Sequence, residues 1–218
     1  MILRVADICA QAINIESVFV ATDDKMIKDI VTQAGFNVVM TSSNALTGTD
    51  RVAEAAAQIE ADIYINVQGD EPLLDPNDII AIIDEKKKYP NEIINGYCDI
   101  NENEDPNSLN IPKVVFNEKN YLLYMSRRLI PASKSNQFKP PRFFKQVCIY
   151  AFNKKELQDF LNFGWKSTNE LYEDIEILRF LEFDSKIRVV KTKKASLAVD
   201  IPEDVKRVEE AILNKNDS

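Results

Sequence analysis

Short apolar runs alternate with helical periodicities through the first half of the chain. Apolar runs at residues 17–21, 37–40 and 63–67 predict strands, and apolar residues spaced three or four apart at 27–34 and 52–59 predict helices between them. This order is typical of parallel strands joined by crossover helices. The pattern therefore predicts an α/β fold.

A predicted helix over residues 3–13 opens the chain, and no predicted strand precedes it. A doubly wound sheet normally begins with a strand whose following turn binds phosphate through backbone amides and a helix N-terminus. We therefore expect an α/β sheet whose first strand is missing.

The second half changes from helices to strand pairs. Asp75 followed by Pro76 predicts a helix N-terminus, and residues 99–112, rich in Asn, Asp, Glu and Pro, predict a long loop. Strands are predicted at 113–116, 121–126, 146–152 and 187–192, and helices at 154–163, 171–181 and 202–213, with Leu171 in the core. We interpret residues 113–150 as a small β-rich insertion and expect it to serve dimerisation.

Composition narrows the possible functions. The 218 residues fit one domain, and a net charge of -8 disfavours nonspecific binding to nucleic acid or to an anionic membrane. The absence of histidine excludes Ser-His and Cys-His mechanisms and His-ligated metals. If the protein is an enzyme, carboxylates, Lys, Arg and a hard metal must carry the chemistry.

The cysteine content and the hydropathy of the chain indicate the cellular compartment in which we expect it. Cys9, Cys98 and Cys148 are odd in number and far apart, so the sequence indicates neither a disulfide framework nor a zinc site. No apolar stretch has the length of a membrane span or of a signal-peptide core. We therefore expect a soluble cytoplasmic protein with no membrane partner.

The strongest candidate for chemistry follows the strand at 63–67. Residues 66–72 read Asn-Val-Gln-Gly-Asp-Glu-Pro, so Asp70 and Glu71 come directly after a glycine at the end of a strand. Paired carboxylates at such an edge can bind a divalent metal and the phosphates it carries. A turn with a solvated acidic pair explains the same residues.

A second acidic group lies near the C-terminus. Asp200 follows an apolar pair and precedes a predicted helix, so it could converge with Asp70 on one Mg²⁺, which takes few protein carboxylates. Glu203 and Asp204 are better explained as acidic residues that favour the helix N-terminus.

Two further segments could bind anions. Residues 47–51, Thr-Gly-Thr-Asp-Arg, place hydroxyls and the Arg51 guanidinium in a loop before a helix, which could hold a phosphate or a base edge. A helix cap at Thr49 or Asp50 explains this loop nearly as well. Arg127, beside Arg128 after a strand, could bind a sugar carboxylate, although adjacent arginines are also common on solvated surfaces.

Several of these segments together resemble the CMP-sugar synthetase family, and within it the 3-deoxy-manno-octulosonate (Kdo) cytidylyltransferases. The resemblance rests on residues 20–24, 47–51, 66–72, 124–127 with 130–131, 149–150, 176–179, and 199–200 with 202–204. Each segment alone is weak evidence, but the set occurs in the family's order and covers the chain from end to end.

The resemblance implies a Rossmann-like nucleotidyltransferase sheet with helices on both faces and, as function, transfer of CMP from CTP to a 3-deoxy-octulosonate sugar. Pyrophosphate would be released, and the product would serve lipopolysaccharide synthesis. The resemblance also implies a homodimer. It assigns Asp70 and Asp200 to Mg²⁺, which makes them the catalytic residues. It assigns Thr22, Asp23, Thr49 and Arg51 to the nucleotide, and Gln68, Tyr124, Arg127, Gln146 and Glu176 to the sugar.

Three departures from the family pattern qualify these implications. The family's first strand and its triphosphate-binding loop would lie before Met1, so we expect weak or no turnover. Gln146 and Ile177 stand where Kdo enzymes usually carry histidine and glutamine, which favours a modified acceptor such as an 8-amino octulosonate. A non-catalytic relative that binds a sugar or a partner, and a nucleotidyltransferase for another acidic sugar, are the alternatives.

Overall fold

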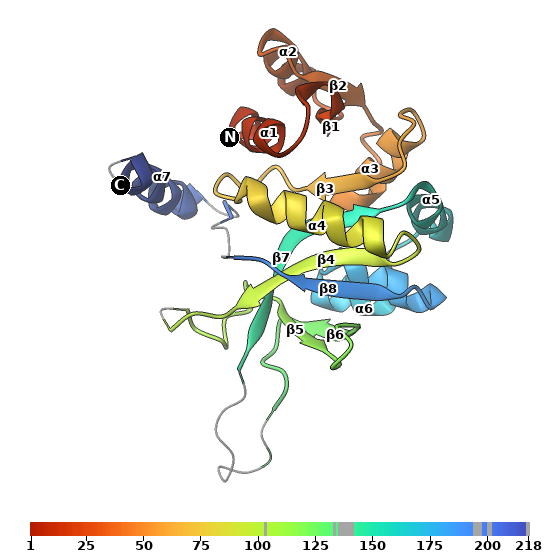
Figure 1. Cartoon of the computed structure of the whole chain (residues 1–218), viewed down its shortest axis with the longest axis vertical. Coiled ribbons are helices and arrows are strands. Elements are labelled where there is room, and N and C mark those ends of the chain that lie inside the picture. The colour runs from red at the N-terminus through yellow and green to blue at the C-terminus, as the bar shows by residue number, and fades with distance from the viewer. Residues whose placement is uncertain (103, 133, 135–141, 194–197, 200–201, 217–218) are drawn as a thin grey trace.

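The computed structural model describes residues 1–102, 104–132, 134, 142–193, 198–199 and 202–216. It has a mixed α/β fold with a two-stranded sheet near the N-terminus and a six-stranded sheet at the centre (Figure 1). The α/β prediction is confirmed. No helix in the described residues has the length and apolar character needed to cross a bilayer.

The N-terminal unit consists of two helices and the smaller sheet. Strands β1 (Phe19–Thr22) and β2 (Asn37–Met40) pair in parallel, as predicted, and helices α1 (Ile2–Ala12) and α2 (Lys25–Gln33) pack on them. The first strand begins later than residue 17 because a 3-10 turn, Ile15–Ser17, precedes it. The buried cluster of this unit is small and consists of Ala6, Val18, Val20, Val31 and Phe36.

The central sheet is built around one long strand. Its strands lie in the order β6 (Leu122–Ser126), β5 (Lys113–Phe116), β7 (Phe144–Phe152), β4 (Ile93–Asp99) and β8 (Ile187–Lys191), and β3 (Tyr64–Val67) also pairs with β7. β7 runs antiparallel to β3, β4 and β5, whereas β8 is parallel to β4. β3 therefore joins the central sheet through β7, a strand from the second half of the chain.

The predicted β-rich insertion contributes directly to this sheet. Residues 113–150 supply β5, β6 and most of β7, and the predicted strand ends agree with the structure to within two residues. The structure describes no partner chain, so the dimerisation role of this segment stays a prediction.

Strand β4 has no counterpart among the predicted elements. Asn95 and Gly96 interrupt its apolar run, and the register with β7 shifts between these two residues. Asn95 is fully buried, and its side-chain amide donates to the carbonyls of Val147 (3.1 Å) and Ile149 (2.9 Å). Asn95 interrupts the apolar pattern by which a strand is predicted, and it supplies hydrogen bonds at the irregular point of the sheet.

The predicted helix over 171–181 is broken in the structure. Helix α6 (Thr168–Glu173) ends at Asp174, which has φ 50°, and the 3-10 helix η2 (Glu176–Phe183) follows. Because of this break Leu171 is 63% exposed, whereas Leu178 is fully buried. The prediction that Leu171 lies in the core is wrong.

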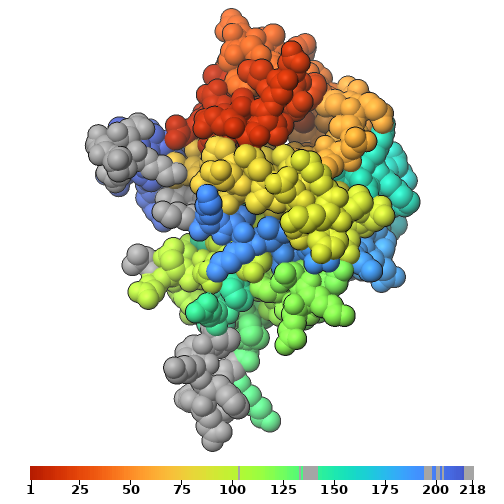
Figure 2. Space-filling view, in the orientation of Figure 1, coloured from red at the N-terminus to blue at the C-terminus, as the bar shows by residue number. Residues whose placement is uncertain are grey.

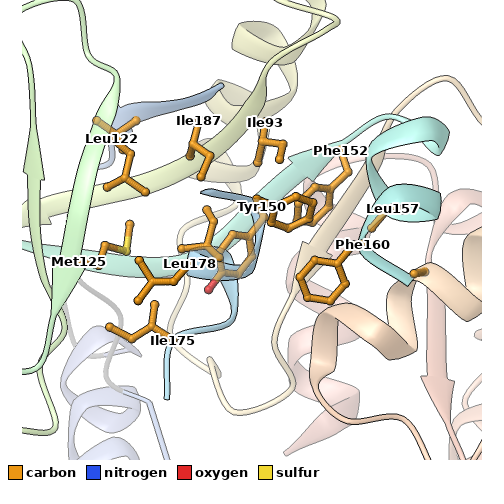
Figure 3. Packing of buried hydrophobic residues seen from close by; sticks show 14 of the residues in the cluster. Ile93, Leu122, Met125, Tyr150, Phe152, Leu157, Phe160, Ile175, Leu178 and Ile187 are labelled. Atoms are coloured by element: carbon orange, nitrogen blue, oxygen red, sulfur yellow. The ribbon is translucent and has the colours of Figure 1, made fainter. Parts of the chain in front are cut away.

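Helices cover both faces of the central sheet, as predicted. Alternate residues of β7 point to opposite faces, so Val147, Ile149 and Ala151 pack against α1 and α4 (Pro76–Lys88). On the other face, Tyr150 and Phe152 pack with α3 (Gly48–Ala56), α5 (Lys154–Phe163) and η2, as Figure 3 shows for part of this cluster. The predicted Asp75 cap of α4 is confirmed by its bond to the N–H of Asn77. The C-terminal helix is α7 (Pro202–Asn216).

Candidate active site

Two adjoining cavities lie at the end of β3. The smaller has a volume of about 380 Å³ and the larger about 980 Å³. Gln68, Asp70 and Glu176 line both cavities. Three of the predicted site residues therefore meet at the junction, although Glu176 is more than 100 positions from the other two in the sequence.

The turn after β3 holds Gln68 and Asp70 in place through its backbone. The N–H of Glu71 donates to the carbonyl of Gln68 at 3.3 Å, and the N–H of Val199 donates to the carbonyl of Asp70 at 2.9 Å. Asp200, the second predicted Mg²⁺ ligand, lies outside the described residues. The convergence of Asp70 with Asp200 stays a prediction.

Glu176 fixes the loop that begins α3. Its carboxylate accepts hydrogen bonds from the N–H groups of Gly48 (3.0 Å) and Thr49 (2.8 Å). Thr47 caps the helix by accepting from the N–H of Asp50. A carboxylate at a helix N-terminus is favourable because it satisfies free N–H groups and interacts with the helix dipole. Because Thr47 is the cap, the alternative caps at Thr49 and Asp50 are wrong.

The predicted nucleotide residues occupy different environments. Arg51 lines the smaller cavity, donates to the Thr41 hydroxyl at 2.6 Å and forms a 3.0 Å ion pair with Asp23. Thr22 is buried, and its hydroxyl accepts from the N–H of Asp24. Thr49 is also buried and contacts Glu176 through its backbone. Of these four residues, only Arg51 lines a cavity.

The predicted sugar-binding residues likewise include some that line a cavity and one that does not. Arg127 and Gln146 line the larger cavity, whereas Tyr124 lines neither cavity and its hydroxyl donates to Asn169 at 3.4 Å. Gln146 donates to the Tyr150 hydroxyl at 3.1 Å.

Arg127 is already held in position by the protein. Its guanidinium donates to the carbonyls of Glu173 (2.6 Å), Leu109 (2.9 Å) and Asp174 (3.0 Å). The carboxylate of Asp174 also lies 3.7 Å from one of its nitrogens. A guanidinium has five N–H donors, so Arg127 has more donors than these three hydrogen bonds use at the wall of the larger cavity.

A buried ion cluster supports this site and was not predicted. Arg179 is fully buried and donates to Asp50 (2.8 and 3.1 Å) and to Glu170 (2.7 and 2.6 Å). Its guanidinium also lies 3.8 Å from the ring centre of Phe160. The sequence does carry a local signal for Glu170, because Ser167 and Glu170 form a capping box. The link to Asp50 required the tertiary fold.

The junction of the cavities is electrically negative. Burial raises the pKa of the Cys148 thiol, and the carboxylates of Glu71 and Asp70 raise it further. Burial also raises the pKa of Tyr150 well above its ordinary value, with Glu176 among the contributing charges. Among the described residues, no group of three or more Asp, Glu or Cys side chains is arranged to hold a metal ion. A cation bound by fewer protein ligands is compatible with the negative junction.

Comparison with known proteins identifies the family. The profile of the family described as cytidylyltransferase matches residues 1–187. The 3-deoxy-manno-octulosonate cytidylyltransferase of Syntrophotalea carbinolica is 40% identical over 96% of this chain and 86% of its own length. The 8-amino-3,8-dideoxy-manno-octulosonate cytidylyltransferase of Shewanella baltica (strain OS185) is 35% identical over 97% of this chain and 87% of its own length.

A solved structure agrees with these relatives. CMP:2-keto-3-deoxy-manno-octonic acid synthetase complexed with CTP matches with a TM-score of 0.89 and 30% identity, over 98% of this chain and 88% of that chain. The family profile, the relatives and the shared fold thus point to the same class of enzyme, a nucleotidyltransferase. The chain belongs to the cytidylyltransferase family.

Proposed function

We propose that this chain transfers CMP from CTP to the anomeric hydroxyl of a 3-deoxy-octulosonate sugar and releases pyrophosphate. The observation that carries the proposal is the pair of cavities joined at Gln68, Asp70 and Glu176, since two substrates must meet at one point for the transfer. Membership of the cytidylyltransferase family and the names of the relatives support the choice of substrates.

The residues around the junction have separate tasks in this proposal. Arg51, in the smaller cavity, would contact the nucleotide, and Arg127, in the larger cavity, would bind the carboxylate of the sugar. Gln68 and Gln146 would orient the sugar hydroxyls. Because little covalent chemistry falls to the protein in such a transfer, positioning accounts for most of what these side chains do.

Asp70 would hold Mg²⁺ at the junction, together with Asp200. Its hard carboxylate oxygen and the negative surroundings of Cys148 fit a divalent cation. When bound, Mg²⁺ would neutralise the charge that develops on the phosphates. The homodimer, the cytoplasmic location and the lipopolysaccharide pathway stay predictions.

The larger cavity favours an acceptor that carries an ammonium group. Seven Asp or Glu side chains but only four Lys or Arg side chains are among the described residues that line it. A sugar with a carboxylate and an amine can satisfy both signs of charge. We therefore propose 8-amino-3,8-dideoxy-manno-octulosonate as the better acceptor and Kdo as the poorer one.

The test measures pyrophosphate release from CTP with Mg²⁺ and each of the two sugars, and nucleotide binding by thermal shift. We expect release only when CTP and an octulosonate are both present, with the amino sugar favoured. A thermal shift with CTP larger than with ATP, GTP or UTP would support the nucleotide assignment even where turnover is slow.

Matched carboxylate variants test the role of Asp70. Asp70→Asn should abolish Mg²⁺-dependent release, whereas Asp62→Asn, at an exposed position just before β3, should leave it unchanged. Equal release from Asp70→Asn and the unmodified protein would overturn the assignment of Asp70. No release and no CTP-selective shift would overturn the proposed function as a whole.

A further inference from the structure

Strand β5 begins with a buried charge to which the proposed function gives no role. Lys113 is fully buried, and its ammonium donates to the carbonyl of Ser108 at 2.8 Å and to the carbonyl of Arg127. Burial lowers the pKa of Lys113, and the nearby charge of Arg127 lowers it further. A buried ammonium is costly and both acceptors are neutral, so an apolar side chain would suit this position better unless the ammonium has a purpose.

Both acceptors of Lys113 border the larger cavity. Ser108 and Arg127 line it, whereas Lys113 lines neither cavity. The guanidinium of Arg127 donates to the carbonyl of Leu109, the residue after Ser108. Lys113 and the guanidinium of Arg127 therefore bind consecutive carbonyl groups of one loop. Because Lys113 also binds the backbone of Arg127, the three bonds close a ring that joins Arg127 to this loop.

The loop, residues 104–112, is attached to the central sheet where it ends. The N–H of Gln146 in β7 donates to the carbonyl of Pro112 at 3.0 Å. Figure 2 shows the yellow-green atoms of the loop beside the teal atoms at the start of β7. Lys113 follows Pro112 directly, and its side chain binds the loop five positions earlier, at Ser108. This bond fixes the cavity wall beside Arg127.

A carboxylate fixes the backbone of Arg127 from the other side. Glu173, at the end of α6, accepts from the N–H of Arg127 at 2.8 Å and from the hydroxyl of Ser126 at 2.7 Å. Lys113 binds the carbonyl of Arg127. The N–H and the C=O of Arg127 are thus each bound by a charged side chain, and such hydrogen bonds are shorter and stronger than neutral ones. Together they set the direction in which the Arg127 side chain enters the cavity.

We propose that Lys113 is a positioning residue that holds Arg127 in the orientation needed to bind the carboxylate of the acceptor sugar. The proposal rests on the proposed function, which assigns that carboxylate to Arg127. Without the ammonium, the carbonyl groups of Ser108 and Arg127 lose their shared donor, and the guanidinium no longer meets the carboxylate in one fixed geometry. Lys113 therefore acts on the affinity for the sugar and not on the affinity for CTP.

The test measures the binding of Kdo and of its C1 carboxamide by calorimetry, with the intact chain and its Lys113→Met variant. We expect Lys113→Met to weaken Kdo binding by at least about tenfold, because a shifted guanidinium loses its contact with the carboxylate. The carboxamide carries no charge for Arg127 to bind, so its affinity should change by less than about twofold. In the release assay the KM for Kdo should rise, while the thermal shift with CTP is retained.

A second buried lysine separates positioning from loss of stability. Lys86 in α4 is also fully buried, donates to the carbonyl of Glu92 at 2.7 Å and lines neither cavity. Lys86→Met should destabilise the protein without changing the affinity for Kdo, and thermal unfolding shows whether each variant is folded. If Lys113→Met does not fold, Lys113→Gln replaces it. This variant keeps an N–H donor without the charge and should show the same selective loss for Kdo, to a smaller extent.

Arg127→Met separates failure of this proposal from failure of the proposed function. It should show the same selective loss for Kdo, larger than that of Lys113→Met. If Arg127→Met loses Kdo affinity but Lys113→Met keeps it, or if Lys113→Met weakens Kdo and the carboxamide equally, the positioning role is wrong and the proposed function stands. If Arg127→Met keeps full Kdo affinity, the assignment of the sugar carboxylate to Arg127 is wrong, and the role of Lys113 in sugar binding is wrong with it.

Discussion

The N-terminal unit and the central sheet are built from similar strands but are stabilised to very different extents. β7 has three strand neighbours and contributes buried residues to clusters on both faces of its sheet. Among the described residues, β1 has one strand neighbour, and the buried cluster beneath it consists of five residues, of which only Phe36 is aromatic. The central sheet therefore buries far more apolar surface, and we expect it to set the global stability.

This difference bears on the active site because the site lies between the two parts. Glu176 and Asp70 belong to the central part, whereas Asp23, the ion-pair partner of Arg51, follows β1. Small openings of the N-terminal unit would then change the nucleotide side of the site without unfolding the sheet. Four predictions test this comparison.

The largest expected effect concerns the buried ion cluster of the central part. Arg179→Met leaves the buried carboxylates of Asp50 and Glu170 without their cation and should lower the free energy of unfolding by about 3–5 kcal/mol. Asp23→Asn, which breaks the half-exposed pair with Arg51, should cost about 0–1 kcal/mol. Urea unfolding measures both, and similar costs would contradict the comparison.

The second prediction uses the same substitution at two glycines. At Gly96 an added Cβ would lie 2.8 Å from Ile149 Cγ2 and 3.1 Å from Thr192 Cγ2, so Gly96→Ala should cost about 3 kcal/mol through overpacking. At Gly35 there is nothing within 4 Å of the added Cβ, but φ is +85°, so Gly35→Ala should cost about 1 kcal/mol through backbone strain.

A second pair of variants separates these two causes. Asn tolerates positive φ better than Ala, so Gly35→Asn should be more stable than Gly35→Ala. At Gly96 the larger side chain should make Asn worse than Ala. The same order of stability at both positions would show that one cause operates at both.

The third prediction compares matched cavities. Val189 in β8 is 1% exposed and Val31 in α2 is fully buried, so Val→Ala removes the same buried methyl groups at each position. Val189→Ala should lower the global free energy of unfolding by about 2 kcal/mol. Val31→Ala should instead speed hydrogen exchange within the N-terminal unit and change global unfolding less. Equal changes in global stability would show that the two parts unfold as one.

Periodicity predicted most of the fold. Apolar runs at residues 37–40 and 63–67 matched strands to within a residue. The helix cap at Asp75 could be predicted because it depends only on neighbouring residues in the sequence. β4 was not predicted, because Asn95 is a buried polar residue whose hydrogen-bond partners lie more than 50 positions away in the sequence. The break at Asp174 was not predicted either, because the left-handed backbone conformation of an Asp does not change the pattern of hydrophobic residues.

The site was predictable where its residues follow strands and unpredictable where they act through distant contacts. Asp70 follows β3 and lines both cavities, and the family resemblance supplied Gln68 and Glu176, which line both as well. Tyr124 was assigned by resemblance to the sugar, yet it lines neither cavity. The bond between Arg179 and Asp50 spans 129 positions and follows only from the packing of η2 on α3.

The smallest expected effect comes from one thiol in each part. Burial raises the pKa of Cys98 in β4 to about 12 and that of Cys9 in α1 to about 11, from an ordinary value of 9.0. Because both pKa values are raised on folding, their contribution is intact below about pH 9 and is lost as the pH rises towards the folded values.

Above about pH 9, the unfolded chain ionises each thiol first, so the free energy of unfolding should fall by up to about 1.4 kcal/mol per pH unit for each. Cys98→Ala should reduce this slope by close to that amount in urea titrations at about pH 8 and about pH 10. Cys9→Ala should reduce it less, because local opening of the N-terminal unit lets Cys9 ionise before global unfolding. Equal reductions, together with equal rates of reaction of the two thiols with a disulfide reagent, would show that α1 opens only with the central sheet.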